Sequence, residues 1–245
     1  MTRQVPWLRI FAEGIAIVVS ILLAFGIQAW WEGRQDSAQA RSLLLAMLDD
    51  FEAAATLLDR VEAETSILAR NGQRLIELGE QGPVSPDHSA QVDSLFGSHF
   101  LRPVFDPPMG TVESLIASGR LDLVRNEELV AGLTNWASAV ASLQRTQTDA
   151  RRHFYDRLYP YLATRVDIED LDKGFSQYLG HPLPFEQGPT EAYRLIGEGE
   201  LMNILYTHWV LSTNVLELEM PRVRAALDQI RDEIGTELAR TRSSS

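Results

Sequence analysis

Histidines are the side chains of this sequence best suited to proton transfer or metal binding near neutral pH. The best local metal-like set is Asp149, His153 and Asp156, which share one face of a predicted helix at i, i+4 and i+7. No H-E-x-x-H motif accompanies it, and such a row on an acidic surface is typical of a solvated helix face. We therefore predict no metal site there, and we interpret His208 as a partly buried bundle residue. The histidines are spread along the chain: His88, His99, His153, His181 and His208.

An acidic run from Asp167 to Asp172 invites interpretation as a calcium site. It fails the EF-hand pattern because no acidic residue stands at the fifth ligand position counted from Asp167. The glycine and the terminal glutamate of that pattern are also out of place. We expect no more than weak cation association in this run.

Motifs for phosphate binding or nucleophilic catalysis are missing from the sequence. The segments at Gly110 and Gly197 lack the P-loop spacing and its lysine, and there is no G-x-S-x-G elbow. Paired carboxylates such as Asp49–Asp50 diverge by about 100° on a helix, so they cannot share a proton. We predict no catalytic residue, no cofactor and no metal site. An enzyme whose residues meet only in three dimensions, around His153 or His208, stays open as an alternative.

The composition limits the classes of partner. The chain has 245 residues, a formal net charge of −12 at pH 7 and 45% apolar residues, which is enough for a packed core. An acidic surface repels phosphate backbones, so we predict no nucleic-acid partner. The absence of cysteine excludes disulfides, thiolate metal sites and a cysteine nucleophile.

One apolar segment stands out near the start of the chain. Residues 14–31 carry no charge, and together with residues 10–12 they approach the roughly 20 residues that a helix needs to cross a bilayer. We predict a transmembrane helix over residues 10–31, after a short tail over residues 1–9. A cleaved signal peptide and a buried soluble helix are the alternatives. The interfacial anchors that we expect are Trp7, Arg9, Trp30 and Trp31.

The predicted membrane helix has one face of small residues. It recurs every fourth position, with a polar amide continuing the row, and consists of Ala12, Ala16, Ser20, Ala24 and Gln28. Small side chains let another helix backbone approach closely, so this face predicts self-association or contact with a protein partner in the lipid bilayer. A chance arrangement of alanines, which are common in such helices, is the alternative.

Beyond the membrane segment, the spacing of apolar residues predicts an acidic helical bundle over residues 32–240. A seam with spacings of three and four runs through the first helix, as in a coiled coil or a long bundle helix. We expect this helix to continue from the membrane segment with at most a bend at Gly33, and to end between Gly79 and Gly82. The seam residues are Leu44, Leu48, Phe51, Ala55, Leu58, Thr65 and Leu68.

The remaining elements follow from turn and cap residues. We predict a short helix over 89–97, an irregular Pro-rich crossover over 102–110 and a short helix with Thr111 as N-cap. Asn126 should cap a helix whose apolar stripe runs from Leu129 to Leu143. We place a loop at 167–189 and begin the last long helix at Thr190, with a kink at Pro221 and a disordered tail over 241–245. The prediction is an all-α protein, with a single transmembrane helix followed by an antiparallel bundle of long helices.

Two segments resemble a bacterial family of uncharacterised single-pass membrane proteins. One is the anchor from Glu13 to Phe25 leading into Trp30-Trp31-Glu32, and the other is 111–126 with its Ser118-Gly119-Arg120-Leu121 turn. The resemblance covers nearly the whole chain and implies an uncleaved anchor and a helical domain, but no activity. Arg3, Arg9 and the α-amine precede the anchor, and Arg34 and Arg41 follow it. This slight excess of positive charge before the anchor favours a cytoplasmic start of the chain and a periplasmic domain at the bacterial inner membrane. A cytoplasmic domain stays open.

Three functions are compatible with these features. The first is a membrane-anchored interaction or scaffold protein of the cell envelope. The second is a sensor domain that binds a small ligand in the bundle and signals through a partner membrane protein. The third is an enzyme with an unrecognised site. We expect a sensor cavity to be lined by four aromatic residues, namely Trp136, Tyr155, Tyr206 and Trp209.

Overall fold

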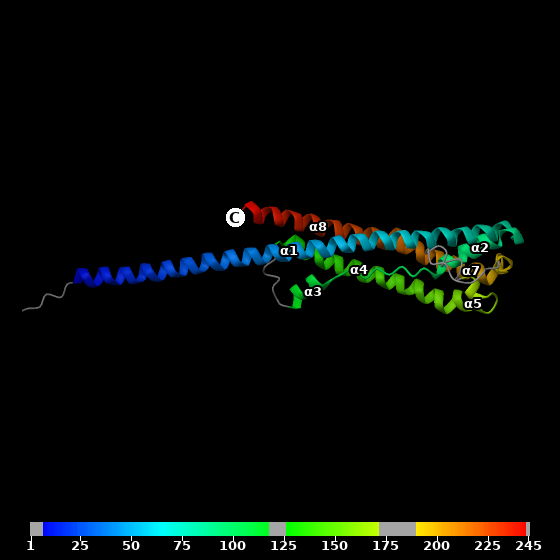
Figure 1. Ribbon diagram of the computed structural model, residues 1–245, viewed down its shortest axis with the longest axis horizontal. Helices are drawn as coiled ribbons and strands as arrows, with labels where there is room; N and C mark the ends of the chain where they lie inside the picture. Colours follow the sequence, from blue (N-terminus) through cyan, green and yellow to red (C-terminus); the bar gives the residue numbers. More distant parts are fainter. Residues whose placement is uncertain (1–6, 118–125, 172–189, 244–245) are drawn as a thin grey trace, which may run out of the picture.

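The computed structural model describes residues 7–117, 126–171 and 190–243, and within these ranges it leaves the side chains of 7–17, 116 and 241–243 undescribed. Every regular element in the described residues is helical, and none is a strand (Figure 1). The prediction of an all-α protein is therefore confirmed.

Helix α1, Trp7–Gln81, has 75 residues and runs the whole length of the bundle and beyond it (Figure 1). At 1.5 Å per residue it is about 110 Å long. It continues through Gly33, so no change of secondary structure separates the predicted membrane segment from the bundle. It ends where expected, because Gly82 follows it with φ 105°, a left-handed conformation that favours glycine after a helix.

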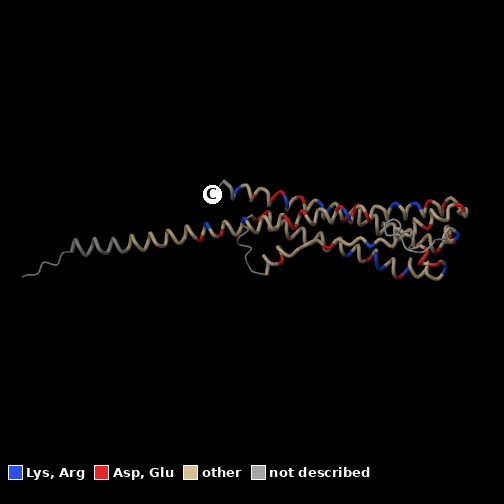
Figure 2. The backbone as a smooth tube through the Cα atoms, viewed as in Figure 1, with Lys and Arg blue, Asp and Glu red and all other residues tan. Residues whose placement is uncertain are grey.

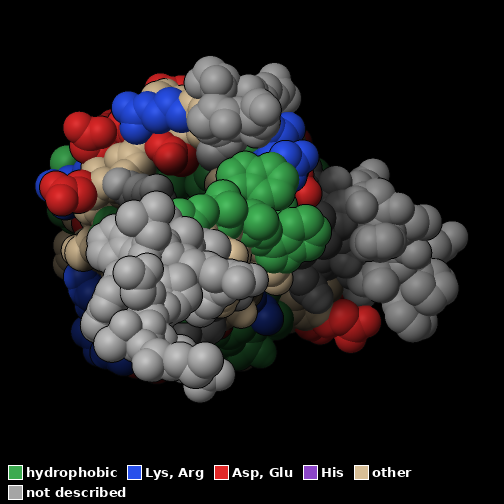
Figure 3. Space-filling view, turned by 90° about the vertical axis from the view of Figure 1, so that its left-hand side faces the viewer, with side chains coloured by type: hydrophobic (Ala, Val, Ile, Leu, Met, Phe, Trp, Pro, Cys, Tyr) green, Lys and Arg blue, Asp and Glu red, His purple; other side chains and the backbone are tan. Residues whose placement is uncertain are grey.

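The first part of α1 projects from the bundle without a neighbouring helix (Figures 1 and 2). Every residue from 18 to 38 is exposed, and the first buried side chain is Leu44. Hydrophobic side chains gather at the end of the molecule from which α1 projects (Figure 3). Among the residues that the structure describes, no helix combines the length and hydrophobicity that crossing a membrane requires.

Three long helical segments build the bundle. The first is α1, and the second consists of α4 (Glu127–His153), a π-helical turn η4 (Phe154–Leu158) and α5 (Tyr159–Ala163). The third consists of α7 (Gly199–Asn214), a π-helical turn η6 (Val215–Glu219) and α8 (Met220–Ser243). It returns along α1 and also packs on α4, antiparallel to both (Figure 1). Helix α8 includes 241–243, part of the predicted disordered tail, whereas 244–245 lie outside the described residues.

The predicted Pro-rich crossover explains why α1 and α4 run in the same direction. After α1 come η1 (Pro86–His88), α2 (Ser89–Gly97) and η2 (Ser98–Phe100) at the far end of the bundle. Residues 101–109 have no regular secondary structure and lead back to α3 (Gly110–Ala117). The return runs antiparallel along α4, because Phe105 N donates to Gln147 Oε1 over 3.1 Å and the Trp136 indole N–H contacts Met109 Sδ at 3.2 Å.

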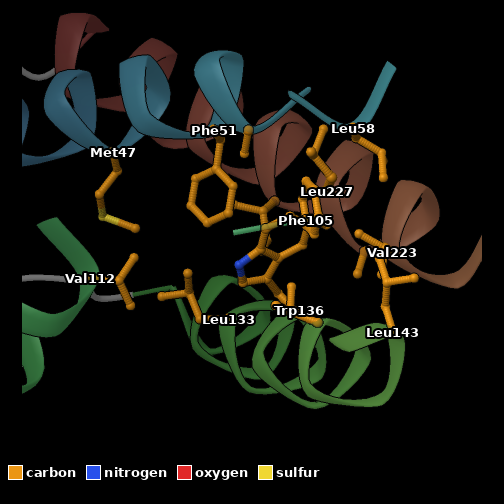
Figure 4. Packing of buried hydrophobic residues seen from close by; sticks show 14 of the residues in the cluster. Met47, Phe51, Leu58, Phe105, Val112, Leu133, Trp136, Leu143, Val223 and Leu227 are labelled. Atoms are coloured by element: carbon orange, nitrogen blue, oxygen red, sulfur yellow. The ribbon is translucent and has the colours of Figure 1, made fainter. Parts of the chain in front are cut away.

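The core consists of two hydrophobic clusters in series along the bundle. The first joins α1 from Leu44 to Val61 with α3, α4 and α8, and at its centre Trp136 packs edge-on against Phe51 and Phe105 (Figure 4). The second joins the end of α1, from Leu75, with α2, η4, α5 and α7. All but two of the seven predicted seam residues of α1 are buried, the others being half-buried, so the seam is confirmed.

Of three predicted helix starts, one is confirmed and two are wrong. Asn126 caps α4 as predicted, because its Oδ1 accepts hydrogen bonds from Glu128 N at 2.9 Å and Leu129 N at 3.1 Å. Thr111 is not a cap. It lies inside α3 and donates its N–H to Asp50 of α1 at 3.2 Å. The predicted start at Thr190 is also wrong, since this residue instead precedes a short 3-10 helix, η5 (Ala192–Leu195), and α7 begins only at Gly199.

Candidate functional site

A layer of buried polar residues separates the two hydrophobic clusters. The layer borders a cavity of about 50 Å³, which is enough for a few water molecules. Its members come from α1, η2, α4 and α7, and each is at most 8% exposed. We call the following set the polar layer: Thr65, His99, Gln147, His208 and Ser212.

Helical spacing places these polar side chains in the core. Gln147 follows Leu143 and Val140 on the inner face of α4, and His208 follows Leu201 and Leu205 on the inner face of α7. They occupy positions at which a bundle usually carries apolar residues. The two hydroxyls of the layer are satisfied within their own helices, since Thr65 donates to Val61 O at 2.7 Å and Ser212 donates to His208 O at 3.0 Å. The imidazole and amide groups must therefore define the chemistry of the cavity.

His99 is held in one orientation by the helix before it. Its Nδ1 lies 3.0 Å from Leu95 O, and because a carbonyl only accepts, Nδ1 carries the proton and Nε2 is an acceptor. Burial disfavours the charged ring and lowers its pKa to about 4, against partial opposition from hydrogen bonds with Leu95 and Phe96. His99 is therefore neutral at physiological pH.

His208 is the least satisfied polar group in the layer. It is 4% exposed, and neither ring nitrogen has a hydrogen-bond partner among the described residues. Its ring centroid lies 5.3 Å from that of His99 and 5.9 Å from that of His153, nearly parallel to the latter. Desolvation, and then the charge repulsion that His99 and His153 would exert, lower the His208 pKa well below its usual value.

Gln147 presents a buried donor to the cavity. Its Oε1 accepts from Phe105 N, so the opposite end of the amide must be the NH₂ group. That Nε2 is buried and has no partner among the described residues. A buried amide donor without an acceptor costs on the order of 1–3 kcal/mol. The layer therefore lacks an acceptor at this point, and a molecule in the cavity would supply it.

Two arginines line the exposed mouth of the cavity. Arg102 belongs to the crossover and Arg151 to α4, and both are exposed. The Arg102 guanidinium lies over the Tyr155 ring, 5.2 Å from its centroid. In the part of the chain that the structure describes, neither arginine forms an ion pair with a carboxylate, although several other arginines do. The mouth is thus a local positive site on an acidic protein.

Both π-helical turns start at the cavity. Phe154 opens η4, Val215 opens η6, and both residues line the cavity. Each turn lies just before a proline, Pro160 or Pro221, which has no N–H to donate and whose ring would clash with the carbonyl four residues earlier. Widening the preceding turn relieves that conflict, so both helices are irregular where they meet the cavity. Such π-bulges occur frequently at functional sites.

Within the described part of the chain, the structure shows no metal site at His153, the histidine of the metal-like set in the sequence. The fold brings His99, His153 and His208 together, but His153 is turned away by a hydrogen bond between its Nε2 and Ile204 O at 3.0 Å. No group of three or more ligands suited to a metal ion occurs in the described residues. Asp149 and Asp156, the partners of His153 in the sequence set, are exposed.

The acidic run has a local structural role at its start. Asp167 Oδ1 accepts a hydrogen bond from Glu169 N at 3.0 Å, which caps the single helical turn at 168–171. Asp172, the last residue of the run, lies outside the described residues, and so does His181.

The four aromatic residues expected to line a sensor cavity do not meet. Trp136 belongs to the first hydrophobic cluster, and Tyr155 is 19 residues further along the same helical segment, about 28 Å away. Tyr206 is 56% exposed and contacts the Trp209 ring at 5.7 Å on α7. None of the four lines the cavity, although Tyr155 positions Arg102 at its mouth. The distance along α4 alone rules out a shared cavity.

The predicted membrane-helix face is described only in part. The side chains of Trp7, Arg9, Ala12 and Ala16 lie outside the described ones. The rest of the face is exposed, namely Ser20, Ala24 and Gln28.

Two polar contacts follow this face at the end of the apolar run. Gln28 Nε2 donates to Glu32 Oε1 at 2.9 Å, so its amide is engaged within the helix. Among the predicted interfacial anchors, Trp30 and Trp31 are both exposed, and the Arg34 guanidinium lies 5.7 Å from the Trp30 ring centroid.

Comparisons of the chain with protein-family models, with curated proteins and with solved structures found no match. Membership in the bacterial membrane family therefore stays a prediction from two segments. Function must be argued from the site itself.

Sequence reasoning missed the polar layer as a unit. It identifies His208 as a bundle residue but does not connect Gln147 and His99 with it. One signal was available, because Gln147 continues the spacing of Leu143 and Val140. A polar residue within an apolar helical stripe indicates that its side chain is buried. The partners across the bundle required the fold.

Proposed function

We propose that this protein is a membrane-anchored interaction or scaffold protein of the bacterial cell envelope. Residues 10–31 are the anchor, and α1 carries the acidic bundle away from the bilayer. The bundle presents its surface to another protein, and the anchor contacts a partner helix or a second copy of the chain through its face of small residues.

One observation supports the proposed membrane anchor most directly: α1 is apolar and exposed on every side over residues 18–31. The large hydrophobic side chains in this stretch are between 47% and 65% exposed. Burying one such side chain is worth about 1.5–3 kcal/mol, so leaving all of them in water is strongly unfavourable. A single partner helix would cover only one face, whereas lipid surrounds a helix completely.

The ends of the apolar run suit a membrane interface. Trp30 and Trp31 close the run, and the first acidic residue after it is Glu32. Indole rings favour the headgroup level, where one side of the ring is apolar and the N–H is hydrated. The uncharged run starts before residue 18, at Gly14, and residues 10–12 on the other side of Glu13 bring it to the length of a bilayer span. We place the bundle in the periplasm, in line with the slight excess of positive charge before the span once the α-amine is counted with Arg3 and Arg9.

Flotation with liposomes tests the anchor. The full chain should float with vesicles and resist alkaline extraction, whereas a Leu22→Arg/Phe25→Arg variant should lose most vesicle binding, because a charged residue at a helix centre costs about 2.5–3.5 kcal/mol of insertion. Leu45→Arg is the matched control. Leu45 is also exposed on α1 but lies beside the bundle, so this variant should float like the wild type. Equal flotation of all three proteins would contradict the anchor.

A second candidate function, sensing of a small ligand, is favoured by the cavity in the polar layer. The cavity touches all three long helical segments, and both π-helical turns start at it. A bound molecule would contact Leu68 of α1 as well as Phe154 and Val215. Occupancy of the cavity would therefore reach the helix that leads to the anchor. If the protein is a sensor, ligand binding at the cavity should change the hydrogen-exchange rates of the α1 amides between residues 18 and 43.

A further inference from the structure

The cavity is lined by one ring acceptor, His99 Nε2, but its unpartnered amide and its two arginines are donors. Gln147 contributes an NH₂ group whose orientation is set by Phe105 N, and the arginines at the mouth can only donate. His208 adapts to either role by changing its tautomer. A molecule that satisfies this set must offer acceptors, and one with negative charge also neutralises the two guanidinium groups.

The spacing of Gln147 and Arg151 on α4 and the cavity volume limit the ligand to a small molecule. Gln147 and Arg151 are one turn apart on the same face of the helix, with Ala150 and then Phe154 beside them. Two acceptors a few ångströms apart would therefore reach both groups. The enclosed volume of about 50 Å³ admits only a few non-hydrogen atoms beyond those at the mouth.

The walls require an apolar part in the same molecule. Leu68, Phe154 and Val215 line the same cavity as the polar groups. Inorganic anions have no apolar surface to place against these side chains. A planar carboxylate also matches the fork of a guanidinium, which binds it through two parallel hydrogen bonds.

We propose that the cavity binds a small carboxylate with a second oxygen, of the 2-oxo-acid or 2-hydroxy-acid class. The carboxylate lies at the mouth with Arg102 and Arg151, and the second oxygen accepts a hydrogen bond from Gln147 Nε2. His208 contacts the same end of the molecule. The proposal deepens the sensing function and rests on it for its biological role, but binding itself is measured independently of signalling.

Sodium pyruvate is the probe, titrated into the purified full chain in detergent and followed by thermal shift. Pyruvate should raise the melting temperature with saturation, because a ligand that binds only the folded state stabilises it. Lactamide, which is neutral and of similar shape, should not do so, and inorganic phosphate should bind at least tenfold more weakly. Lactamide or phosphate acting as strongly as pyruvate would overturn the proposal, as would no binding of pyruvate.

Three variants locate the site. Arg151→Gln removes a guanidinium, and Gln147→Glu keeps an acceptor for Phe105 N while replacing the NH₂ donor by a carboxylate oxygen. Each should raise the pyruvate dissociation constant at least tenfold. Arg152→Gln, an exposed neighbour that does not line the cavity, should bind like the wild type. Circular dichroism checks that each variant is folded, and equal affinities of the Arg151 and Arg152 variants would overturn the assignment.

Hydrogen exchange separates the ligand site from its proposed role. If the cavity serves a sensor, pyruvate should slow exchange in η4 and η6 and also along α1 beyond the cavity, between residues 18 and 43. Slower exchange at the cavity alone would retain the site and overturn sensing through the anchor. Failure of pyruvate to bind would overturn the site, while flotation of the chain with liposomes still tests the anchor.

Discussion

His208 carries an energetic penalty that the apolar residues of the core do not, because both of its ring nitrogens are buried without a partner among the described residues. Replacing water around an imidazole by apolar atoms, without a hydrogen bond in return, opposes folding by on the order of 1–3 kcal/mol. The neighbouring rings add to this penalty whenever His208 is protonated, because charge on His99 or His153 would repel it. A residue of this kind destabilises the empty protein and becomes favourable only when a partner reaches its nitrogens.

Acid should therefore unfold this protein earlier than its carboxylates alone would. The unfolded chain has a histidine pKa of about 6.5, whereas burial lowers the His99 pKa to about 4. Below pH 6.5 the unfolded state takes up a proton that the folded state does not, so this stability is complete above pH 6.5 and is lost as the pH falls toward 4. At pH 5 the loss from His99 alone is about 2 kcal/mol, and His208 acts in the same direction.

Urea unfolding at pH 7.5 and pH 5.0 measures this loss in two variants. His208→Leu should reduce the difference in free energy of unfolding between the two pH values, because one buried titrating ring is gone. His88→Gln, at an exposed position, should keep the wild-type difference. If His208→Leu retains the full pH dependence, burial of this ring does not limit stability in acid.

At the scale of single residues, the sequence predicts burial better than it predicts partners. The stripe from Leu129 to Leu143 is buried as its spacing indicates, because helical periodicity alone decides which face is apolar. His99 and His208 are 109 positions apart, and no local pattern relates them. Their meeting depends on the crossover, which returns the chain along α4 and so sets how the helices pack. The cavity could not be predicted for this reason.

At the scale of elements, caps and prolines decide where the helices begin and bend. Asn126 is recognisable from sequence because a cap acts locally, through its own side chain and the N–H groups two and three residues later. Thr190 also makes a local contact, since its Oγ1 accepts from Ala192 N at 3.1 Å, but its hydroxyl and N–H both donate to the buried carboxylate of Asp93 on α2. The local contact is therefore present, but it precedes the short 3-10 helix η5 and not the long helix, which begins at Gly199. Pro221 disturbs the last helix as expected, although its sequence does not reveal the π-helical form of the disturbance.

Asn126 also connects α4 with α8. Its Nδ2 donates to Glu233 Oε2 of α8 at 3.0 Å, while its Oδ1 caps α4. Asn126→Ala should lower the free energy of unfolding by about 1–2 kcal/mol, the usual contribution of a cap. Asn126→Asp retains the cap but places a second carboxylate beside Glu233, so it should also destabilise. Chemical denaturation of the purified chain measures both.

Adding Glu233→Gln to the Asn126→Asp variant provides the control. The neutral amide removes the repulsion between the two carboxylates and donates its NH₂ group to the aspartate introduced at the cap, so stability should recover toward that of the wild type. The same Glu233→Gln change in the wild-type background should give no such gain. Additive effects of the two substitutions would contradict a direct contact between these side chains.

At the scale of the whole molecule, the continuity of α1 links the anchor to the cavity. One helix carries the apolar stretch 18–31, the first hydrophobic cluster, Thr65 and Leu68 at the cavity, and the second cluster from Leu75. A flexible joint between the apolar stretch and the first cluster would isolate the bundle from the anchor. Gly33 is the weakest point between the apolar stretch and the bundle, since it is exposed there and a glycine in a helix costs about 1 kcal/mol relative to alanine.

Spin labels can test whether α1 is continuous at Gly33, and the absence of cysteine lets two introduced cysteines be the only labelled sites. Ile27→Cys and Leu45→Cys, both exposed, span 18 residues and should lie about 27 Å apart along the helix axis. Leu45→Cys with Ala63→Cys has the same spacing within the bundle and is the matched control. In liposomes the two pairs should give similarly narrow distance distributions, and Gly33→Pro should broaden only the first, because proline breaks a helix at this position. A broad distribution for the first pair in the unbroken chain would show that the anchor and the bundle move independently, and it would remove the route from the cavity to the membrane.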